Sequence, residues 1–153
     1  MADVAWRKPK ENSIAALEYG MEYADGVEMD LRLTDEGEVV IHHDPRTPSG
    51  KYPERYGYDD LKHEVALFDD LLDSSGFVDR WVNEARFVCL ELKAPHPSSG
   101  AGGGWLRGKR MHDHLSRLLE SVRSRIEEIQ VPVQSTVFYS FDPYITSVAD
   151  MGL

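Results

Sequence analysis

The chain has 153 residues, the length of a single domain that can bury a hydrophobic core. Hydrophobic residues make up 41% and charged residues 29%, which excludes an intrinsically disordered chain, and no run approaches the roughly 20 apolar residues of a membrane span. The 17 basic and 27 acidic side chains give a formal net charge of -10, an excess that repels phosphate backbones and argues against nucleic-acid binding.

In the first part of the chain, strands are predicted on either side of a helix. Residues 3–6 form a short apolar strand, and residues 11–13 provide capping side chains for a helix whose apolar residues recur at helical spacing. Strict alternation of apolar and charged residues predicts a strand over 27–33. A turn over 35–37 joins it to a second strand over 38–42, so the two should form a hairpin-like pair.

The middle of the chain predicts a loop, a helix and a buried strand. Residues 45–58 are rich in proline, glycine, tyrosine and charge, which is typical of an exposed loop. A helix begins at 65, and the Ser-Ser-Gly cluster at 74–76 interrupts or ends it. Residues 86–92 are a nearly continuous apolar run, which indicates a strand covered on both faces.

The last third contributes another helix and strand after a long glycine-rich loop over 94–108, which is expected to be flexible. Residues 115–129 carry the strongest helical periodicity, a strand follows over 136–141, and a further helix begins at 144. Strands that alternate with helices favour parallel strands with right-handed crossovers, so the predicted fold class is α/β. An open α/β sheet and part of a larger α/β barrel both fit this order.

Charged side chains share one face of the strand over 27–33, because residues two apart point the same way. These are Glu28, Asp30 and Arg32, and an exposed polar face is the simplest interpretation. The apolar strand over 86–92 favours a functional interpretation instead, since Glu91 and the following Lys93 share a face at the carboxyl end of that strand. Sites in α/β folds lie at the carboxyl ends of parallel strands, so these groups are candidate site residues.

The residue types indicate metal and phosphate chemistry. Three carboxylates supply hard oxygen ligands suited to Mg²⁺ or Ca²⁺: Glu28, Asp30 and Glu91. Lys93 beside them would attract an anion such as phosphate. His43, at the end of the adjoining strand, adds a group that transfers protons near neutral pH.

The remaining histidines are weaker candidates. His42 precedes His43, and neighbouring strand residues point opposite ways, so only one of the two should face the site. His96 and Trp105 lie in the glycine-rich loop and could cover a substrate, although a mobile surface loop is the slightly favoured interpretation. The others are placed on predicted helices or surface loops, without a direct role: His63, His112 and His114.

Two features bear on cellular location. Residues 1–4 lack the basic region and apolar stretch of a secretory signal. Cys89 is the single cysteine, so no internal disulfide can form and nothing in the chain depends on an oxidising compartment. A cytoplasmic protein is therefore expected.

Six segments, taken in chain order, follow the motifs of one known family. They read Ala-Trp-Arg-Lys-Pro-Lys-Glu-Asn-Ser at 5–13, Glu-Met-Asp-Leu-Arg-Leu-Thr-Asp-Glu-Gly at 28–37, Val-Val-Ile-His-His-Asp at 39–44, Leu-Phe-Asp-Asp-Leu-Leu at 67–72, Glu-Leu-Lys at 91–93 and Ser-Phe-Asp at 140–142. Together they resemble the glycerophosphodiester phosphodiesterases. That family begins with His-Arg-Gly and then Pro-Glu-Asn-Thr or Pro-Glu-Asn-Ser, followed by Glu-x-Asp-Val-x-x-Thr-x-Asp-Gly and Val-Val-x-His-Asp. A helix comes after the His-Asp loop, and Glu-x-Lys and Ser-Phe follow it.

The resemblance implies a partial (β/α)8 TIM barrel. Residues 1–153 would be the N-terminal part of a glycerophosphodiester phosphodiesterase-like domain, with strands one to four and their helices, open at the C-terminal end. A complete barrel needs about 250 residues and eight strands. An incomplete barrel leaves an open sheet edge, so self-association through that edge is expected.

The resemblance also implies an activity, the metal-dependent cleavage of small glycerophosphodiesters to glycerol phosphate and an alcohol. A divalent cation, Mg²⁺ or Ca²⁺, would be held by three carboxylates: Glu28, Asp30 and Glu91. Arg7 and Lys93 would hold the phosphate. Two histidines act as general acid and base in the family, and His43 matches one of them.

The first motif departs from the family pattern in two places. Trp6 stands where the family has its other catalytic histidine, and tryptophan can neither accept nor deliver a proton at its indole N–H under ordinary conditions. Lys8 stands where the family has glycine. Two alternatives to an active hydrolase follow: a catalytically impaired relative that binds metal and phosphorylated ligands, and an inactive fragment.

Overall fold

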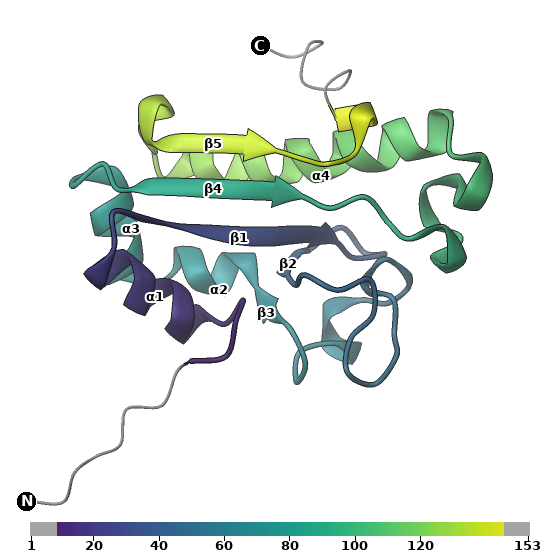
Figure 1. Ribbon diagram of the computed structural model, residues 1–153, viewed down its shortest axis with the longest axis horizontal. Coiled ribbons are helices and arrows are strands. Elements are labelled where there is room, and N and C mark those ends of the chain that lie inside the picture. Colours follow the sequence, from purple (N-terminus) through teal and green to yellow (C-terminus); the bar gives the residue numbers. More distant parts are fainter. Residues whose placement is uncertain (1–8, 146–153) are drawn as a thin grey trace, which may run out of the picture.

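The computed structural model describes residues 9–145, which form one sheet and the helices packed against it (Figure 1). Helices and strands follow one another in the order α1 (Ile14–Tyr23), β1 (Gly26–Leu33), β2 (Val39–Ile41), β3 (Ala66–Leu67), α2 (Phe68–Leu72), α3 (Ser75–Val82), β4 (Phe87–Leu92), α4 (Lys109–Glu128) and β5 (Thr136–Tyr139). The predicted strand over 3–6 and residues 146–151 of the last predicted helix lie outside the described residues.

The sheet has five strands in the order β3-β2-β1-β4-β5. β4 lies parallel to both β1 and β5, as the alternation of strands and helices predicts. β2 pairs antiparallel with β1, with Leu31 opposite Ile41 and Leu33 opposite Val39, so the hairpin is confirmed. Within residues 9–145 the sheet is not closed, and the fold is mixed α/β with an open sheet.

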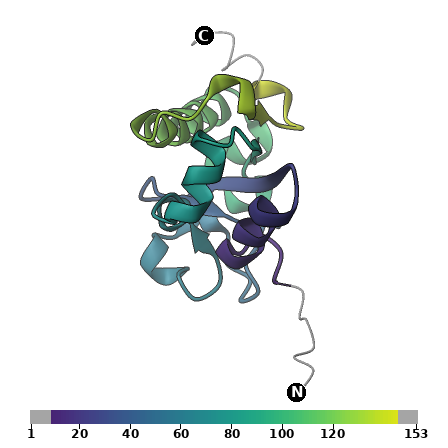
Figure 2. The ribbon, with the colours of Figure 1, turned by 90° about the vertical axis from the view of Figure 1, so that its left-hand side faces the viewer.

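Helices cover the apolar face of the sheet. Met29 on β1 and Leu90 on β4 lie opposite each other in register and are fully buried. α4 packs against both strands and lies behind β5 in Figure 1. Figure 2 views the sheet from the end at which β1, β4 and β5 begin, with α4 on one side. The buried residues of α4 are Met111, Leu115, Leu118, Val122 and Ile126, which follow the predicted spacing.

The N-termini of α1 and α4 differ in how they are fixed. Ser13 is the N-cap of α1, where its side-chain oxygen accepts a hydrogen bond from the backbone N–H of Ala16 at 3.3 Å, as the predicted capping side chains require. α4 begins after Gly108, which has a positive φ of 61° and no capping side chain.

No helix among residues 9–145 is both long and apolar enough to cross a membrane.

The predicted helix over 65–72 is wrong at its start. Ala66–Leu67 forms β3 and α2 begins only at Phe68. β3 pairs with β2, with Val40 opposite Leu67, so hydrogen bonding to an open strand edge prevails over the helical spacing. The predicted helix ends just before the Ser-Ser-Gly cluster, because α2 ends at Leu72, and the cluster begins the next helix, with Ser74 as the N-cap of α3.

Both predicted loops contain short 3₁₀ helices. The segment 45–58 includes one at Pro53–Arg55, in which Glu54 is buried, so the expectation of an exposed loop is wrong there. The glycine-rich segment 94–108 forms two, Pro97–Ser99 and Ala101–Leu106. Gly102 has a positive φ of 61°, and a Cβ on it would lie 2.8 Å from the Pro95 ring, which restricts this position to glycine.

The first half of β4 is covered on one face and open on the other. Phe87 is 53% exposed and Cys89 is half-buried, so the expectation of a strand covered on both faces is wrong for its first half. Val137 of β5 lies opposite Cys89 and is also exposed. The second sheet face is therefore open and apolar at the start of β4 and becomes ionic toward its end.

Gly26 is predicted to be irreplaceable at the start of β1. A Cβ at this position would lie 2.2 Å from the backbone oxygen of Phe87, its partner in β4. Gly26→Ala should therefore lower the free energy of unfolding by about 1–3 kcal/mol, the usual range for overpacking. Urea denaturation measures this loss.

Gly76→Ala is the matched control for this prediction. Gly76 lies in α3, and a Cβ there meets only the flexible end of the Arg80 side chain, at 3.3 Å. Since alanine favours a helix over glycine, this variant should be as stable as the parent or slightly more stable. Equal stability of both variants would contradict the close strand contact.

Candidate active site

The sheet register brings three carboxylates together. Glu28 and Asp30 point to the same face of β1, and Glu91 of β4 lies opposite Asp30. One carboxylate oxygen from each residue lies within 4.8 Å of the other two. Asp30 and Glu91 are only 3% and 5% exposed, whereas Glu28 is exposed. The interpretation of this face of β1 as an exposed polar face is therefore wrong for Asp30, which is buried, and is confirmed for Glu28, which is exposed.

Lys93 lies directly on two of these carboxylates. Its Nζ is 2.9 Å from Asp30 Oδ1 and 2.7 Å from Glu91 Oε1. Burial disfavours the charged ammonium, but the hydrogen bonds to Glu91 and Asp30 outweigh it, so the pKa of Lys93 is raised and the side chain stays protonated. The lysine expected to attract phosphate is thus anchored at the carboxylate set formed by Glu28, Asp30 and Glu91.

Two residues outside the predicted site hydrogen-bond to the carboxylate set. Asn12 Nδ2 donates to Asp30 Oδ2 at 2.8 Å, and the Asp30 N–H donates to Asn12 Oδ1 at 3.3 Å. Asn12 adopts a positive φ of 55° just before α1. Tyr139 donates its hydroxyl to Glu28 Oε1 at 2.9 Å. Tyr139 lies opposite Glu91 in the β4–β5 register, so alternation along 136–141 is a signal that could have found it.

The carboxylate set carries an excess of negative charge. Burial raises the pKa of Glu28, and the neighbouring Asp30 and Glu91 raise it further, while the Tyr139 hydrogen bond works against the rise. Three carboxylates against one ammonium leave two formal negative charges. The donor atoms are hard oxygens, so the set fits a divalent cation such as Mg²⁺ or Ca²⁺.

His43 lies on the segment that follows β2. Its ring is 61% exposed, and Nδ1 is 3.0 Å from Asp44 Oδ1, a contact that lowers the pKa of Asp44. The ring of His42 instead contacts the backbone oxygen of Arg46 at 3.0 Å through Nε2. The backbone of this segment is tied to the carboxylate strand, because the His42 N–H donates to Asp30 O at 2.8 Å.

Arg32 forms a buried ion pair that sequence reasoning missed. It is 3% exposed, and its Nη1 lies 2.8 Å from Glu54 Oε1 on the 3₁₀ helix Pro53–Arg55. Burial raises the pKa of Glu54, and the nearby guanidinium counteracts this. Glu54 is remote in sequence and follows no pattern shared with β1, so only the three-dimensional fold identifies it.

The other predicted residues fall into separate groups. Arg7, Trp6 and Lys8 lie outside the described residues. His96 stacks near Tyr52, with ring centroids 6.1 Å apart, and contacts Trp105 edge-on at 6.3 Å. These rings form a cluster of their own on the segments that follow β2 and β4.

The histidines without an expected site role include His112 and His114, both on α4. His114 of α4 has a buried Nε2 without a hydrogen-bond partner, and burial lowers its pKa to about 4. Its neutral form therefore prevails near neutral pH. His112 lies one turn from Ser116, with Nδ1 3.5 Å from the serine hydroxyl.

Small hollows flank the carboxylate set. One of about 420 Å³ is lined by Glu28 and Asn12 beside α1. Another of about 280 Å³ is lined by Glu91 and Lys93 together with Ser140 and nearby residues. Each hollow therefore adjoins one carboxylate of the set, Glu28 in the first and Glu91 in the second.

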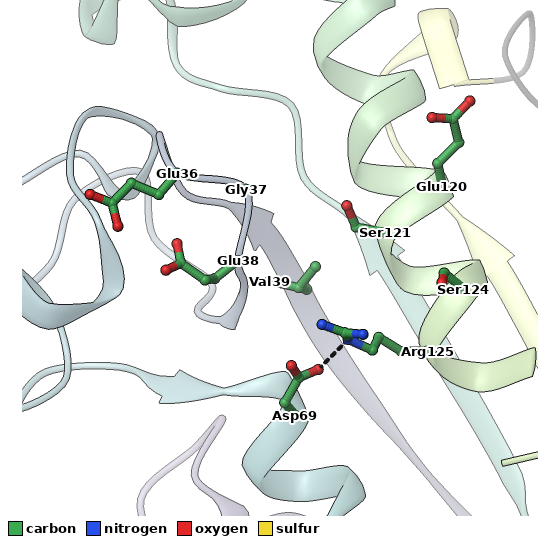
Figure 3. Close-up of a pocket in the computed structure, with 9 residues that line it drawn as sticks. All are labelled: Glu36, Gly37, Glu38, Val39, Asp69, Glu120, Ser121, Ser124 and Arg125. Atoms are coloured by element: carbon green, nitrogen blue, oxygen red, sulfur yellow. Dashed lines mark hydrogen bonds and ion pairs between the residues drawn. The ribbon is translucent and has the colours of Figure 1, made fainter. Parts of the chain in front are cut away.

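A hollow of about 520 Å³ lies elsewhere, between the β1–β2 turn, α2 and α4 (Figure 3). Arg125 of α4 reaches across it to Asp69 of α2, with Nε 2.9 Å from Oδ1. None of the predicted site residues is among its lining, which consists of Glu36, Gly37, Glu38, Val39, Asp69, Glu120, Ser121, Ser124 and Arg125. This hollow is therefore separate from the carboxylate set.

Tyr139→Phe should raise the pKa of Glu28, because the hydroxyl lost in this variant stabilises the ionised carboxylate. A carbon-detected NMR titration of the glutamate side chains measures the change. Tyr52→Phe is the matched control, since that hydroxyl accepts a hydrogen bond from Arg46 instead. An unchanged Glu28 pKa in Tyr139→Phe would contradict the assigned hydrogen bond.

Comparison with known proteins finds one family with a similar sequence segment and fold. Residues 4–51 match the model of the glycerophosphoryl diester phosphodiesterase family. No curated protein sequence matches the chain. Solved structures of similar fold include a glycerophosphodiester phosphodiesterase from Thermotoga maritima, which is 18% identical with a TM-score of 0.62 and is matched over 94% of this chain and 52% of that one.

Two further structures agree. A glycerophosphodiester phosphodiesterase from Parabacteroides distasonis is 20% identical, with a TM-score of 0.60, over 92% of this chain and 54% of that one. A phosphodiesterase from Oleispira antarctica, solved in complex with the product sn-glycerol-3-phosphate, is 16% identical, with a TM-score of 0.66, over 95% of this chain and 57% of that one.

The chain spans about half the length of these structures, and at such identities the likeness shows the fold. The open five-stranded sheet corresponds to about half of their barrels. The resemblance to the glycerophosphodiester phosphodiesterases is therefore confirmed, in sequence over residues 4–51 and in fold over about half the length of the family's solved structures.

Proposed function

We propose that the carboxylate set is the metal and phosphate site of a phosphodiester hydrolase of the glycerophosphodiester phosphodiesterase type. The observation that carries this proposal is the convergence of Glu28, Asp30 and Glu91 within 4.8 Å, with two formal charges left uncompensated by Lys93. The family match over 4–51 supports the reaction class. The glycerol phosphate in the Oleispira antarctica structure supports glycerophosphodiesters as the substrate class.

Each residue has a role in this proposal. The carboxylate set would hold a divalent cation, Mg²⁺ or Ca²⁺, which when bound polarises a phosphoryl oxygen. Lys93 is held by Asp30 and Glu91 and would bind a phosphoryl oxygen with its remaining N–H, assisted by Arg7. His43 would transfer the proton to or from the alcohol oxygen, and its Nδ1 contacts Asp44.

Metal binding is the direct test of the carboxylate set. Glu28→Gln should weaken Mg²⁺ or Ca²⁺ binding by more than about tenfold, because it removes one of three charged ligands. Isothermal titration calorimetry measures the affinity. Glu120→Gln on α4 is the matched control, since it removes the same charge at the hollow of Figure 3 and should leave the affinity unchanged. Equal affinity in the Glu28 variant would disprove the metal assignment.

A second candidate function, binding without turnover, is favoured by Trp6. This residue occupies the place of the family's first catalytic histidine, and its indole N–H cannot act as a general acid or base at neutral pH. A chain that retains the carboxylate set and Lys93 but lacks this proton carrier would bind phosphorylated ligands and release them unchanged.

Hydrolysis of glycerophosphocholine by Trp6 variants decides between the two functions. With saturating metal, the parent should be slow, and Trp6→His should raise turnover by roughly 10²–10⁴, the usual contribution of one general acid or base. Trp6→Ala opens the same space without a proton carrier and should stay slow. Equal gains in both variants would mean that tryptophan blocks the substrate, and no gain in either would favour the binding function.

We also propose that the open sheet face and the free edge of β5 associate with a second copy of the chain. Three apolar residues are exposed there: Phe87 at 53%, Val137 at 44% and Phe141 at 86%. β5 pairs with β4 on one side, and its other edge is unpaired among the described residues. The same strand in a second copy offers complementary N–H and C=O groups, which gives a two-fold arrangement.

Sedimentation velocity tests this association. The parent should form dimers at micromolar concentration, and Val137→Lys should shift it to monomers, because the lysine places a charge in the apolar contact. Tyr23→Lys changes an exposed aromatic residue on α1 and should leave the dimer intact. A monomeric parent at these concentrations would rule the association out.

A further inference from the structure

Arg32 contacts three separate segments with one buried guanidinium. Its Nε donates to His42 O at 3.1 Å and its Nη2 to His43 O at 2.8 Å, on the segment after β2. Its Nη1 donates to Glu54 Oε1 at 2.8 Å and to Ala94 O at 3.5 Å. Ala94 follows Lys93 directly, so this guanidinium connects the backbone of His43 to the backbone beside the site lysine.

The geometry of these contacts requires arginine. A guanidinium carries five N–H donors in a rigid plane, whereas a lysine ammonium is a single point of charge with three donors. Two parallel hydrogen bonds to the neighbouring carbonyls of His42 and His43 use one edge of that plane. Glu54 occupies another N–H group and compensates the buried charge.

The ring of His43 has few contacts that could fix its position. It is 61% exposed, and the Asp44 carboxylate that it contacts is itself 72% exposed. Contacts between exposed side chains are weak and readily rearranged. The position of the His43 ring therefore depends on its backbone, which is held by Arg32 and by the adjacent hydrogen bond between the His42 N–H and Asp30 O at 2.8 Å.

We infer that Arg32 is a positioning residue, which holds the backbone of His43 in place next to β1, the strand that carries Glu28 and Asp30. Glu54 supports it by keeping the guanidinium directed at the two carbonyl groups. The inference rests on the proposed function only in giving His43 a chemical role. The positional claim itself is independent of metal binding and hydrolysis.

A double variant, Arg32→Met with Glu54→Met, separates positioning from stability. Removing both partners of a buried ion pair and replacing them with apolar side chains avoids an unpaired buried charge, so the thermal midpoint should stay within a few degrees of the parent. The backbone order parameters of His42 and His43, from ¹⁵N relaxation, should fall from about 0.85 to below about 0.6. Unchanged order parameters at these two amides would overturn the inference.

Arg32→Lys is the second variant and decides alone if the double variant does not fold. Lysine keeps a positive charge but has no planar edge with two N–H groups, so it cannot reproduce the paired hydrogen bonds to the two carbonyl groups and also reach Glu54. The expected result is a loss of order confined to residues 42–44, and order equal to that of the parent would overturn the inference. Arg46→Met is the matched control, because this arginine side chain contacts Tyr52 on the same segment and its loss should leave His43 ordered.

The same samples distinguish this inference from the proposed function. The double variant leaves Glu28, Asp30 and Glu91 intact, so its affinity for Mg²⁺ should equal that of the parent. A parent that binds no metal and hydrolyses no substrate would end the proposed function, and the order parameters of His43 would still test the role of Arg32. Order lost in the double variant, with metal affinity retained, is the result that supports positioning.

Discussion

Buried negative charge dominates the open face of this sheet. Asp30 and Glu91 lie side by side in register and are almost inaccessible to water, and unpaired charges in such places are strongly unfavourable. Lys93 compensates part of that charge directly, and Asn12 supplies a neutral donor to Asp30. These polar contacts around Asp30 and Glu91 all meet one requirement, the stabilisation of two buried negative charges.

The same electrostatic requirement explains why the donor set suits a divalent cation. Lys93 forms ion pairs with both buried carboxylates, so neither of them is left without a cationic partner. Glu28 is the more exposed of the three, and its carboxylate is held by Tyr139 from the neighbouring strand. Glu28 is therefore the accessible carboxylate of the set, and Asp30 and Glu91 are its buried members.

Alternation along the strands made part of this arrangement predictable. The shared face of Glu28 and Asp30, and of Glu91 and Lys93, follows from the two-residue period, and parallel pairing brings the two sets together. The burial of these side chains could not be predicted from alternation, because it depends on segments that are distant in the sequence and pack over the strands. Glu54 is an example, since it reaches Arg32 from a segment that reads as an exposed loop.

The fold was predictable to a similar degree. Helical spacing located α4 well, because its apolar stripe is long and matches a buried face. It failed over 65–72, where the first two residues pair with β2 instead of starting a helix. Short segments near a sheet edge have little periodicity, so the pairing partner decides their structure.

The backbone of Asn12 restricts which residue can take its place. Its positive φ of 55° is tolerated by glycine, asparagine and aspartate far more readily than by other residues. Glycine has no amide to bind Asp30, and aspartate would add a fourth negative charge to a site that already has too many. Backbone shape and charge thus select one side chain independently, and even a substitution that keeps the size of Asn12 would disturb the site.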